Sequence, residues 1–299
     1  MHRTARRSAA ALAAALVLSA CGGDVPRDAV AVVDGVDIPA AQLEGWVREA
    51  TEANPSLVEA DLQRDLLSRA IQNRIVSDVL AARGLEVTDE ALAAIAADVE
   101  AQVGGAEALE TTLADVGFPR GFYDDVFLAS EAAIDLIALD LVGDRALETR
   151  TARHILVETA AEADEIVALL AGGADFAALA AERSTDPGSA AEGGLLGARE
   201  RGVFVPEFDA AVWSARLDVV LDPVETEFGF HVIEVVEEAS TSAADLSASE
   251  RRQLAGAELD EVLGGALRDA DVTVRSRIGD WDAAAGVVVA PQAVGAGRW

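Results

Sequence analysis

The chain has 299 residues, and its 23 basic and 53 acidic side chains give a formal charge of −30 at pH 7. This balance argues against binding to nucleic acid, whose phosphates require a basic face, and against electrostatic adhesion to anionic lipid head groups. The hydrophobic fraction of 51% excludes wholesale disorder, which requires low hydrophobicity together with high net charge. A chain of this length is typical of about two domains.

The first residues have the pattern of a secretory leader. Three arginines precede an apolar run and a short closing segment: Arg3, Arg6, Arg7, then 9–17, then 18–21. An apolar run of this length is typical of a signal peptide and is too short to span a membrane. The segment 18–21 resembles a bacterial lipobox, and this resemblance implies that residues 1–20 are removed and that Cys21 carries a lipid.

Cys21 is the only cysteine of the chain, and once it is acylated no disulfide can form. The expected product is a protein of the cell envelope, held at the extracytoplasmic face of the membrane by the lipid on Cys21, with 21–28 as a short tether. The alternative is ordinary secretion with cleavage near Ala20, which leaves Cys21 as an unpaired thiol. In either case the protein works where ATP is not available.

The region 29–147 is predicted to be mainly helical after two short strands. The strands are expected at 29–33 and 36–38, and the helices at 40–53, at 59–82, from 89 to about 103, at 106–116 and at 119–141. Gly84 is expected to end the second helix, and Thr88 is expected to cap the third. This region contains no titratable cluster that indicates chemistry.

From Thr151 the pattern changes to short strands, helices and loops. Strands are predicted at 152–157, 219–226 and 230–236, helices at 162–170, 176–182 and 206–213, and a loop at 184–197. A linker is expected at 240–242, and the capping box from Ser247 to Glu250 predicts a helix that runs to about Arg268. A strand is expected at 272–275, and the tail from Ala283 onward shows little periodicity.

Seven short motifs follow one another in this part of the chain: 153–157, 173–176, 184–190, 193–197, 205–208, 223–226 and 228–233. Together they resemble the parvulin family of peptidyl-prolyl cis–trans isomerases. The resemblance implies a four-stranded sheet surrounded by helices over 148–238, and an isomerase that needs no cofactor.

The flanking regions, 29–147 and 239–299, resemble those of the secreted parvulin chaperones SurA and PrsA. In these proteins an N-terminal helical segment and a returning C-terminal helix form one chaperone domain. The predicted fold class is therefore α+β, with a split, mainly helical chaperone domain into which the parvulin domain is inserted.

The parvulin resemblance also implies roles for individual residues. The catalytic positions are a pair of imidazoles, a hydroxyl that links them by hydrogen bonds, and a carboxylate near the substrate carbonyl: His154 and His231, Thr226, and Asp186. Leu196, Phe204 and Phe208 are expected to form the pocket for the proline ring, and Phe228 is a further residue expected to bind the substrate.

The chemistry of the reaction agrees with such a site. An X-Pro bond isomerises over a barrier of about 18–20 kcal/mol, and the twisted transition state has lost its amide resonance. A catalyst needs an apolar pocket for the ring and polar groups that favour the twisted amide, but no nucleophile, metal or cofactor. Of the three histidines in the chain, only His154 and His231 remain after the leader is removed.

The histidines have two other interpretations, a structural role and a metal site. A buried pair can serve only to hold the sheet together. Two histidines can also indicate a metal, but no third ligand has suitable spacing and no thiol is usable, so no metal is expected.

Three positions depart from the usual parvulin pattern. Leu195 stands where the family has aspartate, which is expected to loosen the loop, and Phe204 stands where methionine is common, which gives a stiffer pocket wall. Asp218 lies where a glycine turn precedes the third strand, and this change is expected to affect local strand geometry. Glu158 and Glu162 would repel phosphoserine, so no preference for phosphorylated targets is expected.

The sequence therefore predicts a lipid-anchored foldase that isomerises X-Pro bonds in unfolded or nascent secreted polypeptides. One alternative is a non-enzymatic holdase with a degenerate parvulin module, and another is an envelope assembly factor for one dedicated partner. The acidic surface is expected to be a solvated shell, and it can also keep the protein from sticking to itself.

Overall fold

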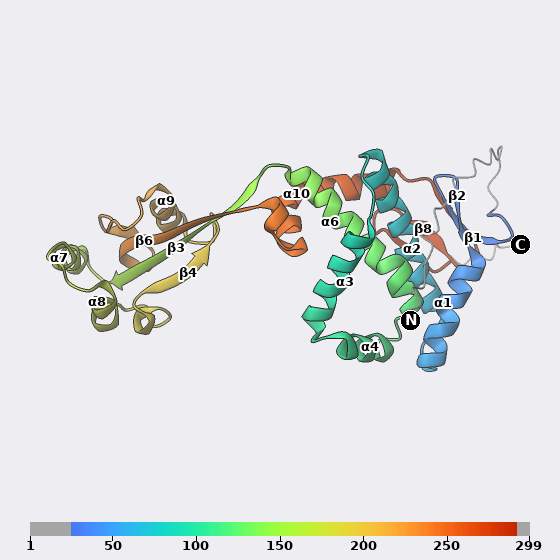
Figure 1. Ribbon diagram of the computed structural model, residues 1–299, viewed down its shortest axis with the longest axis horizontal. Coiled ribbons are helices and arrows are strands. Elements are labelled where there is room, and N and C mark those ends of the chain that lie inside the picture. Colours follow the sequence, from blue (N-terminus) through green and yellow to red (C-terminus); the bar gives the residue numbers. More distant parts are fainter. Residues whose placement is uncertain (1–24, 292–299) are drawn as a thin grey trace, which may run out of the picture. The chain divides into compact units, whose positions relative to one another are not determined.

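The computed structural model describes residues 25–291, and within it the chain forms two compact units (Figure 1). The first unit contains residues 25–75, 103–127 and 266–291, and the second contains 76–102 and 128–265. The leader and Cys21 lie outside the described residues. Among the described helices, none is both long and apolar enough to cross a membrane.

A three-stranded sheet in the first unit joins the two ends of the chain. Its order is β2 (Val36–Pro39), β1 (Ala29–Val33) and β7 (Val272–Val274), and β1 pairs antiparallel with both neighbours. Since the middle strand comes from the start of the chain and an edge strand from its end, this domain is split in sequence. The predicted α+β fold class with a split, mainly helical domain is confirmed.

Helices cover this sheet and supply most of its core. They are α1 (Ala40–Ala53), the first part of α2 (Glu59–Ala82) and α5 (Arg120–Phe122); α4 (Ala106–Asp115) is a further helix of the same unit. The core of the first unit includes Trp46, Leu66, Ile71 and Phe122, all buried. The limits predicted for the first two helices are confirmed.

The helix predicted over 119–141 is present, but a π-helical turn (Tyr123–Phe127) interrupts its α-helical pattern between α5 and α6 (Leu128–Val142). The wider turn accompanies aromatic packing, with Phe122 edge-on to Trp46 and Tyr123 stacked on Phe127. The tail also forms a hairpin, β8 (Asp280–Asp282) and β9 (Val287–Val289), which is too short for a periodic signal.

The helical part of the second unit contains the end of α2, α3 (Asp89–Val103), α6 and α10 (Ala248–Asp269). The Ser247–Glu250 capping box is present, and Thr88 accepts a hydrogen bond from the backbone of Ala91, so both caps are confirmed. Asp135 and Arg251 form a partly buried ion pair with two contacts of 2.8 Å. This pair links α6 to α10, two helices far apart in the sequence.

The remainder of the second unit is a four-stranded antiparallel sheet flanked by three helices. The strand order is β4 (Leu195–Arg199), β3 (Ala146–Val157), β6 (Gly229–Ser242) and β5 (Val224–Thr226). The helices are α7 (Ala160–Ala171), α8 (Phe176–Arg183) and α9 (Pro206–Ser214). One hydrophobic core contains Ile155 and Val232 with residues of α7 and α8, and a second contains Ala152 and Ile233 with residues of α9.

Several strand limits differ from the prediction. The central strands are longer than expected, and their register runs from Ala146 opposite Ser242 to Val157 opposite Phe230. The expected linker at 240–242 is therefore wrong, because these residues pair with 146–148. β4 lies partly in the predicted loop 184–197, and of the run 219–226 only β5 is a strand, because Pro223 has no N–H to donate to the ladder.

The substitution at Asp218 preserves the turn that glycine usually makes. Asp218 has a φ of 57° and donates its backbone N–H to the carbonyl of Val235 at 2.9 Å. Aspartate tolerates this left-handed conformation better than most residues because its short side chain can bond locally. Leu195 is 46% exposed, so the leucine that replaces aspartate faces solvent.

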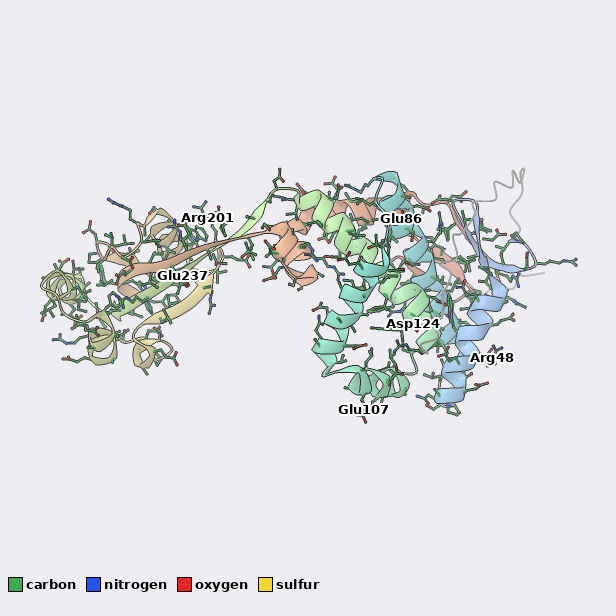
Figure 2. The ribbon with its side chains drawn as sticks, viewed as in Figure 1. Arg48, Glu86, Glu107, Asp124, Arg201 and Glu237 are labelled. Carbon is green, nitrogen blue, oxygen red and sulfur yellow. The ribbon has the colours of Figure 1, made fainter. Side chains whose placement is uncertain are left out.

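Acidic side chains are distributed over the surface of both units (Figure 2). Glu107 and Asp124 are exposed in the first unit, and Glu86 and Glu237 are exposed in the second. The high net charge is therefore carried by solvated faces rather than by one buried cluster.

The left-handed backbone at Asp218 gives a test of this turn. We expect Asp218→Val to lower the free energy of unfolding by about 1–2 kcal/mol, because a β-branched side chain is strained at positive φ. Asp218→Asn, which tolerates the same conformation, is the control and should change it by less than about 0.5 kcal/mol. Urea unfolding measures both, and equal stability of the two variants would contradict the assignment.

Candidate active site

Two buried histidines meet on one face of the central strands. In the β3–β6 register, His154 lies opposite Ile233 and His231 lies opposite Leu156. Since side chains alternate along a strand, both rings lie on the face that packs against α9. Their Nδ1 atoms are 3.0 Å apart, and the residues are only 6% and 4% exposed.

The loop after α8 brings a carboxylate to the other side of His154. Oδ2 of Asp186 lies 2.8 Å from Nε2 of His154, and it also accepts a hydrogen bond of 2.6 Å from the hydroxyl of Ser189. The backbone N–H of Gly188 donates to Oδ1 at 3.0 Å. Both carboxylate oxygens therefore have partners.

Thr226, at the end of β5, lies beside the second histidine. Its Oγ1 is 2.7 Å from Nε2 of His231 and accepts a hydrogen bond from the backbone N–H of Phe228. Thr226 was expected to link the two imidazoles to each other. In the structure its hydroxyl bonds only His231, and the two rings contact each other directly. The result is one continuous chain of hydrogen bonds from Thr226 to Asp186.

The ionisation states of Asp186 and His231 determine which atom donates in each hydrogen bond between Thr226 and Asp186. Hydrogen bonds, first from Ser189 and then from His154, lower the pKa of Asp186 to about 2, so it is a carboxylate at neutral pH. Burial, and then the neighbouring His154, lowers the pKa of His231 to about 4, so this ring is neutral.

A carboxylate can only accept, so His154 donates its Nε2–H to Asp186. In the neutral form of His154, Nδ1 accepts the Nδ1–H of His231, whose Nε2 in turn accepts the hydroxyl proton of Thr226. Every hydrogen bond of the chain then contains one proton, and each ring has one defined tautomer.

Aromatic and aliphatic side chains form a wall next to the histidines. Phe208 on α9 packs edge-on against both rings, with centroid distances of 5.6 Å to His154 and 5.1 Å to His231. Phe204 packs on Phe208 at 4.8 Å, and Leu196 belongs to the same hydrophobic cluster. The structure therefore brings together the three residues expected to form the pocket for the proline ring.

Phe228, the further residue expected to bind the substrate, is 63% exposed in the turn between β5 and β6. Its backbone is tied to Thr226, so its ring stands at the border of the site rather than in the buried cluster. An exposed aromatic side chain beside a polar site can contact a bound peptide outside the ring pocket.

Ser189 belongs to the site but is not among the residues expected from the sequence. It is 2% exposed, and its Oγ is 3.1 Å from Nε2 of His154 as well as bonded to Asp186. The only signal in the sequence is its place three residues after the aspartate, within a motif that also contains glycine and proline.

Gly194 has a related structural role. Its φ is +81°, and an added Cβ would lie 2.2 Å from the carbonyl oxygen of His154. The backbone N–H of His154 donates a hydrogen bond to the carbonyl of Gly194. Only glycine allows this close approach between the loop and β3. Within residues 25–291 no group of three histidine, cysteine or acidic side chains is arranged to hold a metal ion.

Comparison with known proteins relates both the site and the whole chain to one family. Residues 148–237 match the family described as Rotamase: PPIC-type PPIASE domain. The Foldase protein PrsA of Halalkalibacterium halodurans is 30% identical over 285 residues, which is 89% of this chain and 83% of the relative. That of Caldanaerobacter subterraneus is 45% identical over 86 residues, 29% of this chain and 28% of the relative.

Among solved structures, a peptidylprolyl isomerase (PrsA) from Bacillus cereus is 22% identical to this chain. The match covers 83% of this chain and 93% of that one, with a TM-score of 0.38.

The low pKa of His231, about 4, predicts how stability depends on pH. Between pH 6.5 and 4 the unfolded chain binds a proton that the folded chain does not, so acidification favours unfolding. We expect a loss on the order of 3 kcal/mol that is absent above pH 6.5 and complete below pH 4. His231→Gln should remove most of this dependence. An NMR titration that found the His231 ring half-protonated near pH 6.5 would contradict it.

Proposed function

This chain belongs to the PrsA family of foldases, and we propose that it isomerises X-Pro bonds at the hydrogen-bonded pair of His154 and His231. It is a peptidyl-prolyl cis–trans isomerase of the parvulin type, because it carries the PPIC-type domain within a chain related to PrsA foldases over most of its length. The observation that supports the proposed site is the unbroken chain of hydrogen bonds from Thr226 to Asp186 beside the wall formed by Phe208.

The catalyst has to favour the twisted amide over the planar one. A planar X-Pro amide places partial negative charge on its oxygen and keeps the nitrogen lone pair in resonance. In the twisted transition state this resonance is lost, so the oxygen is less negative. Only contacts that distinguish these two states lower the barrier.

Asp186 supplies such a contact. Its side chain remains partly exposed at 25%, while its pKa of about 2 keeps it ionised. A carboxylate near the substrate oxygen repels the planar amide more strongly than the twisted one, because the planar oxygen has the larger negative charge. In this role Asp186 destabilises the ground state relative to the transition state without forming a bond.

The histidine pair holds this arrangement rigid. Both rings are buried, and Phe208 fixes them from one side by two edge-on contacts. With one defined tautomer in each ring, His154 and Thr226 present the same donors and acceptors in every catalytic cycle. No proton has to leave the chain, because isomerisation breaks no covalent bond.

The apolar wall provides the binding energy for the ring. Phe208 and Phe204 form a tilted aromatic pair, with Leu196 in the same cluster. Burying the proline ring against this wall orients the amide next to Asp186 and the histidines. Phe228, exposed at the border, is placed to contact a neighbouring residue of the client.

The wider role follows from the flanking regions. We propose that the clients are unfolded or nascent secreted polypeptides that contain proline, and that 29–147 and 239–299 together form the chaperone domain around the parvulin domain at 148–238. We also propose that Cys21 carries the lipid that anchors the protein at the extracytoplasmic face of the membrane.

Removing the carboxylate tests the catalytic site. We expect Asp186→Ala to lower kcat/KM for proline-containing peptides by about 10–100-fold, equivalent to about 1.4–2.7 kcal/mol of transition-state stabilisation. The control is Asp164→Ala, an acidic-to-alanine change at an exposed position of α7, which packs in the other core. Isomerisation kinetics measure both variants. Unchanged kinetics in Asp186→Ala and in His154→Ala would overturn the proposed site, and suppression of client aggregation without isomerisation in the unmodified protein would favour a holdase.

Replacing the cysteine tests the anchor. We expect Cys21→Ser to move the protein from the membrane fraction to the soluble extracellular or periplasmic fraction, because the thiol that accepts the lipid is lost. Mass spectrometry of the unmodified protein should show diacylglycerol on the N-terminal cysteine. A free Cys21 thiol in the secreted protein would instead support ordinary cleavage near Ala20.

A further inference from the structure

Ser189 is a buried hydroxyl at the end of the hydrogen-bond chain. Its Oγ lies 2.6 Å from Oδ2 of Asp186 and 3.1 Å from Nε2 of His154, so it contacts both partners of one hydrogen bond. We infer that Ser189 is a positioning residue for isomerisation, whose hydroxyl fixes the orientation of Asp186 and, through it, the tautomers of His154 and His231. This inference rests on the proposed function of the histidine pair.

The direction of the Ser189 hydroxyl follows from its neighbours. Ionised Asp186 has no proton to give, so the hydroxyl donates to Oδ2. A lone pair of Oγ then faces Nε2 of His154, whose N–H points between Oδ2 and Oγ. Two acceptors for one N–H hold the proton of His154 on Nε2 and away from Nδ1.

The same hydroxyl also fixes the carboxylate. Oδ2 receives Ser189 and His154, while Oδ1 receives the backbone N–H of Gly188, so the carboxylate cannot rotate without losing a donor. The Ser189 hydrogen bond is the largest influence that lowers the pKa of Asp186. The titratable group that acts on Asp186 is His154, and Asp186 in turn raises the pKa of His231; neither histidine comes from the Asp186 loop.

The effect extends to the far end of the chain. When His154 has its proton on Nε2, its Nδ1 is free to accept from His231, and Nε2 of His231 can accept from Thr226. Without Ser189, Oδ2 of Asp186 loses a donor that holds it against His154, so the carboxylate can turn away from Nε2 and the opposite set of tautomers becomes closer in free energy. Both rings are then expected to exchange between tautomers.

The position of the loop depends on other contacts. The hydroxyl of Ser184 accepts hydrogen bonds from the backbone N–H groups of Leu156 and Asp186. The backbone N–H of Thr185 also donates to the carbonyl of Leu156 at 2.8 Å. Because these contacts do not involve the Ser189 side chain, losing its hydroxyl is expected to change the proton arrangement more than the fold.

Kinetics separate a positioning role from a binding role. Ser189 is 2% exposed and is therefore out of reach of a client peptide. We expect Ser189→Ala to lower kcat by about 3–10-fold, with KM changed by less than about twofold, the size of effect that loss of one typical hydrogen bond produces. Ser189→Thr keeps the hydroxyl and should recover most of kcat.

Nitrogen NMR reads the tautomers directly. The chain has only three histidines, so a full chain with His2→Gln and 15N-labelled histidine shows only the rings of His154 and His231. We expect single-tautomer shifts in the unmodified site and averaged shifts in Ser189→Ala. The matched control is Ser184→Ala, which removes a hydroxyl of the same loop that bonds only backbone. It is expected to lower the melting temperature and to leave both tautomers unchanged.

Two outcomes would overturn the inference: single tautomers in both rings of folded Ser189→Ala, or a kcat equal to that of the unmodified chain. Averaged nitrogen shifts in Ser184→Ala would also overturn the inference, because tautomer averaging would then follow from any loss of loop stability. The proposed site fails separately, and only if His154→Ala and Asp186→Ala also retain full isomerase activity.

Discussion

Two buried imidazoles whose Nδ1 atoms lie 3.0 Å apart can hold only one proton between them. Protons on both nitrogens would repel, and protons on neither would leave two lone pairs facing each other in a dry site. The pair is therefore forced into one donor and one acceptor. The hydroxyl of Thr226 at one end of the pair and the carboxylate of Asp186 at the other determine which ring donates and which accepts.

This constraint explains why the surrounding structure is so closely packed. The β3–β6 ladder sets the offset of the two rings, and Phe208 packs against both of them. Gly194 allows the loop that carries the carboxylate to approach β3 closely. A small shift in any of these elements would lengthen the contact between the rings, so the stability of the domain and the geometry of the site depend on the same interactions.

Much of the fold and of the site could be predicted from the sequence, for physical reasons that differ between elements. The limits of α1 and α2 were clear because proline, glycine and periodic leucines mark them. The motifs indicated His154, His231, Asp186 and Thr226, and these four lie in one hydrogen-bond chain.

Other features depend on contacts that the local sequence does not encode. β4 and the β8–β9 hairpin are too short for a periodic signal, and residues 240–242 look like a linker until they find partners at 146–148. Asp218 replaces a glycine yet keeps its backbone conformation. The role of Ser189 follows only from the position of its oxygen relative to two other side chains.

The strand order β2-β1-β7 has a consequence for the order in which the protein is made. β1 is synthesised early, but its partner β7 follows much later, and the hydrogen bond from Asp271 to Asp34 joins residues 237 positions apart. The parvulin sheet, whose strands are all present much sooner, can form while this first strand still has an open edge. The order of the strands along the chain therefore allows the isomerase domain to form before the split domain can close.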